Sequence, residues 1–200
     1  MSTPRVNHTM VLLKTGKVLI AGGYPYSTTT ASAELYDPAT DTWSATASMT
    51  IARANHTATL LDSGKVLVVG GNGPTPAERS AELYDPQTGT WTRTSGNPIH
   101  DRIHHAAALL TDGTVLVIGG SPSGAGNTAE LYSPTTNAFS STGSLTTGRS
   151  HFGALRLPDG RVLVVGGRIP FTSNQTDTAE LYDPITKQFT SAGTFAGARE

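Results

Sequence analysis

A pair of adjacent glycines occurs four times in the 200-residue chain, each time directly after a short apolar stretch. Successive pairs are separated by 48, 49 and 47 residues, and they are Gly22-Gly23, Gly70-Gly71, Gly119-Gly120 and Gly166-Gly167. Self-similarity at such a period is typical of proteins built from stacked supersecondary units that share a core. The spacing therefore predicts a repeat architecture, in which most recurring residues belong to the scaffold.

Other landmarks keep the same spacing. An arginine opens each unit, at Arg5, Arg53, Arg102 and Arg149. The letters Ala-Glu-Leu-Tyr follow at 33–36, 81–84, 129–132 and 179–182, and an aromatic residue comes next at Trp43, Trp91, Phe139 and Phe189. At a fixed place in every unit, these tyrosines and aromatics are predicted to pack between units rather than to form a sugar-stacking surface.

An initial Arg, a Gly-Gly after an apolar strand, and a Tyr followed about seven residues later by an aromatic residue resemble the kelch repeat. The resemblance runs from Arg5 to Arg199. It implies an all-β, kelch-type β-propeller with four blades of four antiparallel strands each, closed by itself or part of a larger ring. We predict one domain over 1–200, with blades at approximately 5–52, 53–101, 102–148 and 149–198.

The strand order predicts two different faces. Each unit begins with a hairpin whose tight turn contains Gly16, Gly64, Gly113 or Gly160, and its third strand ends at a turn such as Asp85-Pro86. These short, repetitive turns define the turn face. At the fifth place of the Asp-Pro turn stand Asp41, Gly89, Asn137 and Lys187, and Lys187 is expected to be strained or to form a different turn.

The opposite edge, the loop face, receives the blade-to-blade connections and the segments after each Gly-Gly pair. These segments have 9, 9, 8 and 11 residues and share little composition: Tyr24–Ser32, Asn72–Ser80, Ser121–Thr128 and Arg168–Thr178. Variable loops on a rigid scaffold are where recognition usually occurs. The irregular aromatics Tyr24, Tyr26 and Phe171 in these loops are therefore candidate ligand contacts.

Polar residues lie two and three places after each opening arginine, and most are candidate binding residues: Asn7, His8, Asn55, His56, His104, His105 and His151. The kelch resemblance implies that they approach the mouth of the central channel on the loop face. Repeated imidazoles are also the chemistry of metal sites. However, a ring of blades would hold them too far apart for metal bonds of about 2 Å, so no metal is predicted.

Each unit also supplies one Arg and one Glu, namely Arg5 with Glu34, Arg53 with Glu82, Arg102 with Glu130 and Arg149 with Glu180. Four arginines near one face would suit an anionic ligand. A Glu in a strand covered on both faces nevertheless needs a partner, and the arginine of its own unit or a neighbouring unit is the obvious one. We prefer the structural interpretation.

Composition excludes several classes of function. The net charge of −1 leaves no basic excess for binding nucleic acid. The chain contains no cysteine, so disulfides, thiolate metal sites and a cysteine nucleophile are excluded. No signal peptide or membrane span is visible, because apolar runs such as Val66–Val69 have the length of a strand. The expectation is a soluble protein without a membrane partner, in an undetermined compartment.

The sequence contains no familiar catalytic motif, so no enzymatic activity and no cofactor are predicted. The copper oxidases among kelch propellers need a Cys-modified Tyr, which a chain without cysteine cannot form. We predict a recognition or scaffold module that binds a protein or peptide through its loop face. The alternative is a carbohydrate-binding or structural module of a larger, extracellular bacterial enzyme, with a glycan as partner.

A final expectation concerns the ends of the repeat array. The four units begin and end at the same phase of the repeat, so none is split. An open arc of four blades would expose an apolar sheet face at each end, which favours association. We expect either a fragment of a longer propeller or a homodimer that forms an eight-bladed ring.

Overall fold

The computed structural model describes residues 1, 3–74, 76–121, 126–172 and 174–196. The chain divides into two compact units, Met1–Asn97 (unit 1) and Pro98–Glu200 (unit 2). Unit 1 contains β1 (Thr9–Leu12), β2 (Val18–Ala21), β3 (Ala33–Asp37), β4 (Thr42–Thr46), β5 (Thr57–Leu60), β6 (Val66–Val69), the 3-10 helix η1 (Ala77–Arg79), β7 (Ala81–Asp85) and β8 (Thr90–Arg93). Unit 2 contains β9 (Ala106–Leu109), β10 (Val115–Ile118), β11 (Ala129–Ser133), β12 (Ala138–Ser141), β13 (Gly153–Arg156), β14 (Val162–Val165), β15 (Thr178–Asp183) and β16 (Gln188–Thr194).

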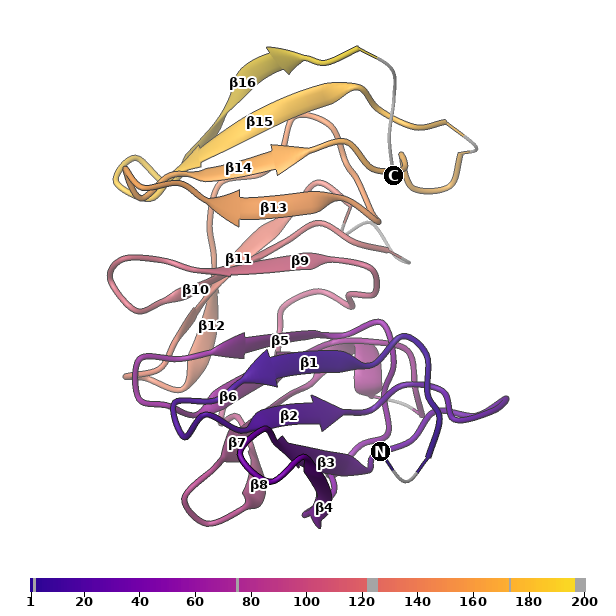
Figure 1. Cartoon of the computed structure of the whole chain (residues 1–200). Helices are drawn as coiled ribbons and strands as arrows, with labels where there is room; N and C mark the ends of the chain where they lie inside the picture. Colours follow the sequence, from indigo (N-terminus) through magenta and orange to yellow (C-terminus); the bar gives the residue numbers. More distant parts are fainter. Residues whose placement is uncertain (2, 75, 122–125, 173, 197–200) are drawn as a thin grey trace. The chain divides into compact units, whose positions relative to one another are not determined.

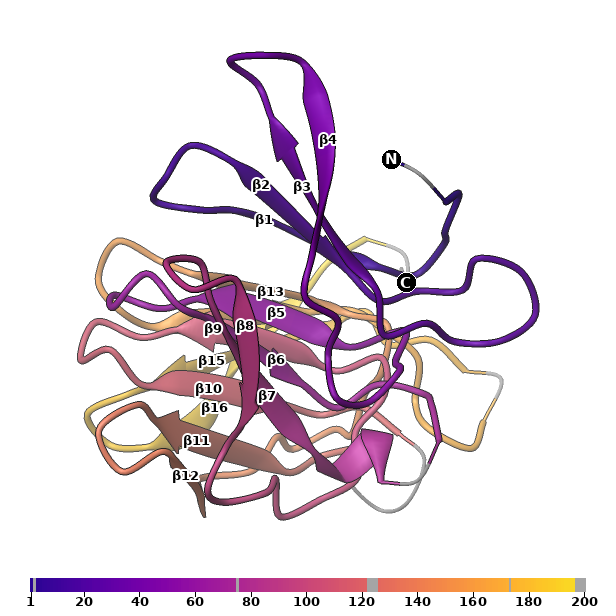
Figure 2. The ribbon, with the colours of Figure 1, turned by 90° about the horizontal axis from the view of Figure 1, so that it is seen from below.

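These strands form four antiparallel, four-stranded sheets of the kelch-propeller type (Figure 1). Each sheet is a meander in which consecutive strands are neighbours, as Figure 2 shows for β1 to β4. We name the sheets blades 1 to 4 in chain order, so that unit 1 holds blades 1 and 2 and unit 2 holds blades 3 and 4. The predicted all-β class and the four blades are confirmed, and the described residues include no α-helix.

Within each unit the two blades pack face to face. The core of unit 1 joins Leu19 and Ala21 of blade 1 to Val66, Val68 and Tyr84 of blade 2. All four residues of β6 are buried, which agrees with a strand that is apolar at consecutive positions and covered on both faces. In unit 2 an equivalent core joins blades 3 and 4, and it contains Ala108, Leu110, Leu116, Ile118, Ala129, Leu145, Val162, Val164 and Tyr182.

The recurring aromatic pair connects the second blade of each unit to the first. Tyr84 and Trp91 have ring centroids 5.0 Å apart. The Tyr84 hydroxyl and the Thr46 hydroxyl of blade 1 are 2.8 Å apart, and Trp91 Nε1 donates to the carbonyl of Ala47. In unit 2, Tyr182 makes the same kind of contact with Thr142 of blade 3. These contacts give the aromatics of blades 2 and 4 the predicted role in packing between blades, whereas Trp43 of blade 1 is 39% exposed.

The turns that follow the third strands share one feature in all blades, a left-handed residue at the fifth position. The carboxylate of Asp85 accepts a hydrogen bond from the amide of Gln87, as Asp37 and Asp183 do from residues two places on. At the fifth turn position φ is +54° for Asp41, +69° for Gly89, +53° for Asn137 and +58° for Lys187. Lys187 therefore forms the same turn as the others, and the alternative of a different turn is excluded.

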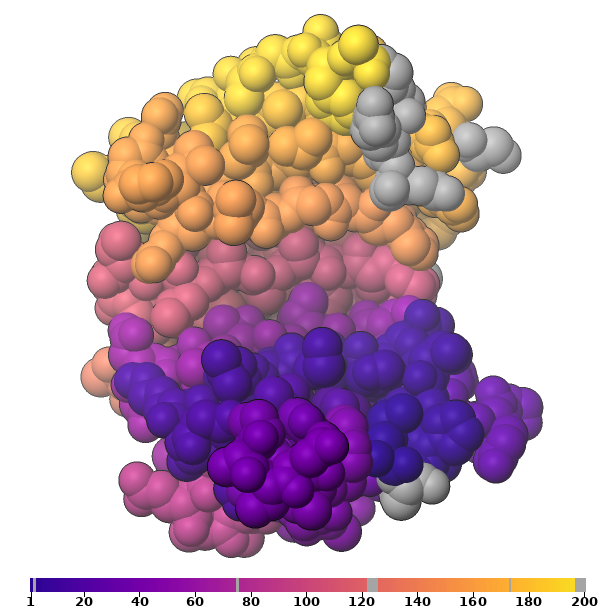
Figure 3. All heavy atoms as spheres, viewed as in Figure 1, coloured from indigo at the N-terminus to yellow at the C-terminus, as the bar shows by residue number. Residues whose placement is uncertain are grey.

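The loops that leave the Gly-Gly pairs lie at the opposite edge of each blade. The connection from β2 to β3, which contains Tyr26, stands out from the loop face of unit 1 (Figure 3). Residues 122–125 of the predicted loop Ser121–Thr128, and the repeat landmark at Arg199, lie outside the described residues. Within the described part of the chain, no helix is long and apolar enough to cross a membrane.

Candidate recognition surface

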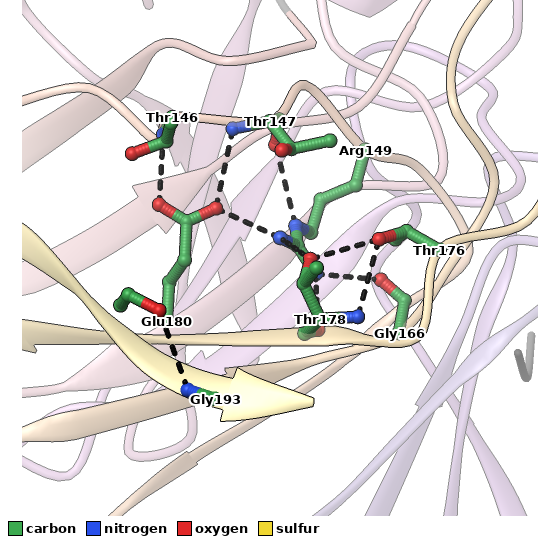
Figure 4. A network of polar contacts seen from close by, with 9 residues as sticks. Thr146, Thr147, Arg149, Gly166, Thr176, Thr178, Glu180 and Gly193 are labelled. Atoms are coloured by element: carbon green, nitrogen blue, oxygen red, sulfur yellow. Dashed lines mark hydrogen bonds and ion pairs between the residues drawn. The ribbon is translucent and has the colours of Figure 1, made fainter. Parts of the chain in front are cut away.

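A buried arginine and a buried glutamate support the loop face in every blade. Figure 4 shows the network in blade 4, where Arg149 Nη2 lies 2.7 Å from Glu180 Oε1. The same guanidinium donates to the carbonyls of Gly166 and Thr178 and to the Thr178 hydroxyl. The Glu180 carboxylate also accepts the backbone amides of Thr146 and Thr147. One ion pair thus joins the incoming connection, the Gly-Gly segment and the third strand.

The other blades repeat this arrangement, and each arginine pairs with the glutamate of its own blade. The N–O distances are 2.8 Å for Arg5–Glu34, 2.9 Å for Arg53–Glu82 and 2.5 Å for Arg102–Glu130. The Arg53 and Glu82 side chains are 0% exposed. Burial lowers the pKa of Arg53, and the nearby Glu82 carboxylate raises it. The Nη groups of the four arginines are committed in this way, which supports a scaffold role for them beneath the loop face.

Sequence reasoning missed one component of this network. The guanidinium of each arginine also contacts a hydroxyl side chain that stands two places before the glutamate, namely Ser32, Ser80, Thr128 and Thr178. The signal was present, because a Ser or Thr precedes Ala-Glu-Leu-Tyr in all four repeats. A hydroxyl at this place supplies an acceptor for the Nη2 group of the buried guanidinium.

The Gly-Gly pairs permit close approach of two backbone segments. Gly71 has φ +95°, and a Cβ built on it would lie 2.5 Å from the carbonyl oxygen of Ala54 and 2.8 Å from His56 Cβ. Gly167 has φ +101°, with the corresponding oxygen of Ser150 at 2.6 Å. No side chain fits at this place, so glycine is required both by conformation and by space. The pairs hold the residues that follow each opening arginine against the blade.

Those residues include one in the left-handed backbone region in every blade. The φ values are +55° for Asn7, +55° for Asn55, +52° for His104 and +54° for His151. Each of these residues stands two places before the first residue of the first strand of its blade. The amide of Asn55 donates to the carbonyl of Asn7, and the amide of His151 donates to that of His104, each at 3.0 Å. The structure therefore brings the predicted candidates together in pairs, one pair in each unit.

In unit 1 the loop face presents amides and tyrosines. The side-chain amide of Asn55 donates to Asn72 Oδ1 at 2.8 Å. Asn72 directly follows a Gly-Gly pair, at the same repeat position as Tyr24. Tyr24 is half-buried and its backbone pairs with that of Val6, whereas Tyr26 is 83% exposed. Asn72 was not among the sequence candidates, although its place after Gly-Gly marks it.

In unit 2 the same positions carry imidazoles and a guanidinium. The rings of His104 and His151 are stacked, with centroids 3.7 Å apart and planes inclined by 22°. Burial, followed by the charges of His151 and Arg168, lowers the pKa of His104 to about 4. Arg168 occupies the position after Gly-Gly and was also missed from the sequence. Phe171, in the loop that follows, is 80% exposed.

The remaining candidate histidines lie deeper. His56 and His105 are 6% and 8% exposed, and each packs its Cβ against the second glycine of its pair. His56 Nε2 is 2.8 Å from the Thr9 hydroxyl, and burial, then the charges of Arg53 and His8, lowers its pKa to about 3. His8 is half-buried in blade 1. In blade 4 this position is held by Phe152, which shows that the place accepts an apolar ring.

Two further features help to define the surface. Among the described residues, no group of three or more His, Cys, Asp or Glu side chains is arranged to hold a metal ion. On the turn face of unit 1, a cavity of about 200 Å³ is lined by Lys14, Thr15, Ser63, Gly64, Lys65, Asp85, Pro86 and Gln87. Its lysines are already engaged, Lys14 with the carbonyl of Asp62 and Lys65 with Asp85.

Comparisons with known proteins agree with this architecture. A family model described as "Kelch motif" matches residues 4–50, 52–98 and 150–195, which is more than half of the chain. The segment of blade 3 between these matches carries the same Arg, Gly-Gly and Ala-Glu-Leu-Tyr landmarks. A search of curated proteins finds no match.

Among solved structures, the chain is similar to a fungal alcohol oxidase of the AA5 family in complex with copper. The sequence identity is 18% and the TM-score is 0.61. The match covers 98% of this chain and 55% of the oxidase chain. The chain therefore spans just over half the length of that protein, and at this identity the likeness shows the fold alone.

Proposed function

Because the chain belongs to the kelch family, we propose that it is a non-catalytic recognition module that binds a protein or peptide through its loop face. One observation carries the proposal. The same left-handed backbone position recurs in all four blades and presents amides in unit 1 and imidazoles in unit 2. A fixed frame with variable side chains is the usual construction of a recognition surface.

The exposed aromatic side chains support the same face. Tyr26 and Phe171 are 83% and 80% exposed, and both belong to loops that follow a Gly-Gly pair. Large amphipathic or aromatic residues provide much contact area at low conformational cost, so they are frequent anchors in protein interfaces. On the turn face, by contrast, the turns repeat a left-handed residue at the fifth position, and Asp37 and Asp85 each accept the amide two places on.

Arrays of immobilised peptides and glycans, probed with the whole chain, test this proposal. We expect signals on peptides that decrease when Tyr26 and Phe171 are replaced by alanine. Lys14→Ala with Arg161→Ala on the turn face serves as the matched control and is expected to leave the signals unchanged. Binding to glycans alone, or an equal loss from both pairs of variants, would contradict the proposal.

A carbohydrate-binding module is the second candidate. The amides of Asn55 and Asn72 and the exposed ring of Tyr26 are groups that suit hydroxylated ligands. The likeness in fold to part of an alcohol oxidase is compatible with a module inside a larger enzyme. The glycan arm of the array experiment separates this candidate from the first.

We further propose that a second copy of the chain is a partner, through an apolar sheet face of blade 1. One row of that sheet consists of Leu12, Val18, Tyr36 and Trp43, which are paired across the four strands. Its counterpart in blade 2, Leu60, Val66, Tyr84 and Trp91, is covered by blade 1. Tyr84 is 0% and Trp91 8% exposed, whereas Leu12 is 64% and Trp43 39% exposed.

On blade 4 the exposed face is the other face of the sheet, the one that does not carry the Tyr and aromatic row. There Leu155, Leu163 and Leu181 are paired in one row, and Leu155 is 67% exposed. In blade 1 the equivalent row, which contains Leu19, is the surface that covers blade 2. The outer face of blade 4 in one copy therefore matches the outer face of blade 1 in another, as a head-to-tail contact.

Light scattering across a dilution series tests this association. The wild-type chain is expected to show twice the mass of a Leu12→Glu variant at high concentration, because a buried charge opposes the contact. Ile185→Glu, at an exposed site on an Asp-Pro turn, is the matched control and should behave as the wild type. Equal masses for wild type and Leu12→Glu at every concentration would contradict a dimer through this face.

A further inference from the structure

Three basic side chains lie together on the loop face of unit 2. Two are imidazoles, which become positively charged on protonation, and the third is a guanidinium, which is always charged. His104 and His151 come from the approaches to β9 and β13, and Arg168 follows the Gly-Gly pair after β14. Arg168 and Ser150 exchange both backbone hydrogen bonds, at 2.8 and 2.9 Å. This bridge ties the start of the Arg168 side chain to the residue beside His151.

The two imidazoles are held in a defined arrangement. The backbone bond from the His151 amide to the His104 carbonyl fixes their main chains, and the rings stack at 3.7 Å. His151 Nδ1 also lies 3.3 Å from the Ser150 hydroxyl. His104 is half-buried, whereas His151 and Arg168 are exposed. The group is therefore built into the frame of the blades, and two of its three side chains reach the surface.

The electrostatic setting of His104 is positive. The pKa of its imidazole is lowered to about 4, first by burial and then by the charges of His151 and Arg168. A protonated His151 and the guanidinium of Arg168 therefore both oppose the protonation of His104. A negative charge near the pair would reverse this effect, since an opposite charge favours the charged form of a group.

We infer that His104, His151 and Arg168 form a subsite for a carboxylate group of the bound peptide, an assignment that rests on the recognition function proposed above. The ring nitrogens of the stacked imidazoles and the guanidinium are the donors. A carboxylate accepts several charge-assisted hydrogen bonds at once, which suits a cluster of such donors.

A transition-metal ion fits the geometry less well. Metal-binding imidazoles direct a nitrogen lone pair, which lies in the ring plane, toward one point at about 2 Å. The rings of His104 and His151 are stacked 3.7 Å apart with planes inclined by only 22°, and lone pairs that lie in two such planes do not converge readily on one atom at that distance. In addition, Arg168 contributes a positive charge that a cation would have to overcome.

Unit 1 provides the matched variant. At the positions of His104 and His151 it carries Asn7 and Asn55, with φ within a few degrees of theirs. Asparagine tolerates the left-handed region well. The double substitution His104→Asn and His151→Asn therefore removes the imidazoles while keeping a side chain that this backbone already holds. Arg168→Gln removes the third group by itself.

The first experiment follows the imidazole signals by NMR during acetate and chloride titrations at equal ionic strength. Acetate is expected to raise the pKa of His104 and His151 by about one unit, because a bound anion favours the imidazolium. His8, outside unit 2, should respond alike to both salts. A His104 pKa that is the same in acetate and chloride, or a response that persists in Arg168→Gln, would overturn the inference.

Peptides distinguish the two sources of a carboxylate. One has an acidic side chain and an amidated C-terminus, a second has neutral side chains and a free C-terminus, and a third has neither. At least one of the first two should bind about tenfold more tightly than the third, and the His-to-Asn double variant should lose that preference. Equal affinity for all three, or zinc binding that the double variant abolishes, would overturn the assignment.

These results also separate the subsite from the general proposal. Peptide binding that depends on Tyr26 and Phe171 but not on His104 and His151 would leave the recognition function standing and remove the carboxylate subsite. Conversely, an acetate response without any peptide binding would retain the anion subsite and contradict the recognition of peptides.

Discussion

The loop faces of units 1 and 2 share a backbone and differ in chemistry. Asn7 and Asn55 in unit 1 have nearly the same φ values as His104 and His151 in unit 2, and each pair is joined by an amide-to-carbonyl bond of 3.0 Å. Asn72 in one unit is replaced by Arg168 in the other. The comparison shows that the frame is set independently of the side chains it presents.

Below the surface the two units hardly differ. In both, an arginine binds the carbonyl of the first glycine of a pair, a hydroxyl side chain and a glutamate. The side chains that bind the main chain here are therefore buried ones, which do not reach the loop face. This separation explains how amides and imidazoles can occupy equivalent places.

The largest effect is expected from breaking the buried ion pairs, and it should be equal in the two units. Arg53→Ala and Arg149→Ala each leave a buried carboxylate without its cation, which typically costs about 3–5 kcal/mol. Urea unfolding measures the loss. Lys65→Ala, which removes a half-exposed pair with Asp85, is the control and should cost at most about 1 kcal/mol. Unchanged stability with a lost ligand would favour direct binding by the arginines.

A smaller, pH-dependent effect is expected at His56. Its pKa is about 3 in the folded chain and about 6.5 unfolded, so only the unfolded state binds a proton between these values. Stability therefore falls as the pH drops through this window, by about 1.4 kcal/mol per unit. His56→Phe places at this position the ring that blade 4 carries as Phe152. When the pH falls from 6.5 to 5, the free energy of unfolding of this variant should decrease by roughly 2 kcal/mol less than that of the wild type.

Urea unfolding of both proteins at the two pH values checks this. Carboxylate titration is common to the wild type and the variant and cancels in the difference. The absence of any difference in pH dependence would show that His56 is not held neutral by the fold.

The smallest effect is expected at the turn face of blade 4. Lys187 has φ +58°, a conformation that costs a residue with a side chain about 1 kcal/mol. Lys187→Gly should relieve part of this strain and raise the melting temperature slightly. Asn137→Gly, at the same turn position in blade 3, is the control and should bring less benefit, because asparagine adopts the region readily. A lower melting temperature for Lys187→Gly would contradict the strain.

Much of the fold could be predicted from the sequence because its determinants recur. Four Gly-Gly pairs, four opening arginines and four Ala-Glu-Leu-Tyr stretches each have a single structural explanation, and the blades follow from them. Glu82 in a strand covered on both faces required a cation, and Arg53 provides it. The special conformation at the fifth place of the Asp-Pro turn could also be predicted. For Lys187 the sequence allowed either strain or a different turn, and the structure excludes the different turn.

The candidate surface was less predictable, since it depends on contacts between residues that are distant in sequence. The stacking of His104 on His151 joins residues 47 apart, and no local pattern indicates it. The burial of His56 and His105 follows from the glycines that lie against them. The repeat position that holds Asn72 and Arg168 differs in every repeat. The contacts of these two residues with Asn55 and His104 become apparent only in the structure.

The most direct test of the central claim is to map a selected peptide on the chain by calorimetry with two sets of alanine variants. The loop-face set contains Tyr24, Tyr26, Asn55, His104 and Phe171, and the turn-face set contains Lys14, Lys65, Asp112 and Arg161. We predict that the loop-face set weakens binding at least about tenfold while the turn-face set leaves the Kd unchanged. An equal loss from the two sets, or a loss confined to the turn face, would contradict recognition through the loop face.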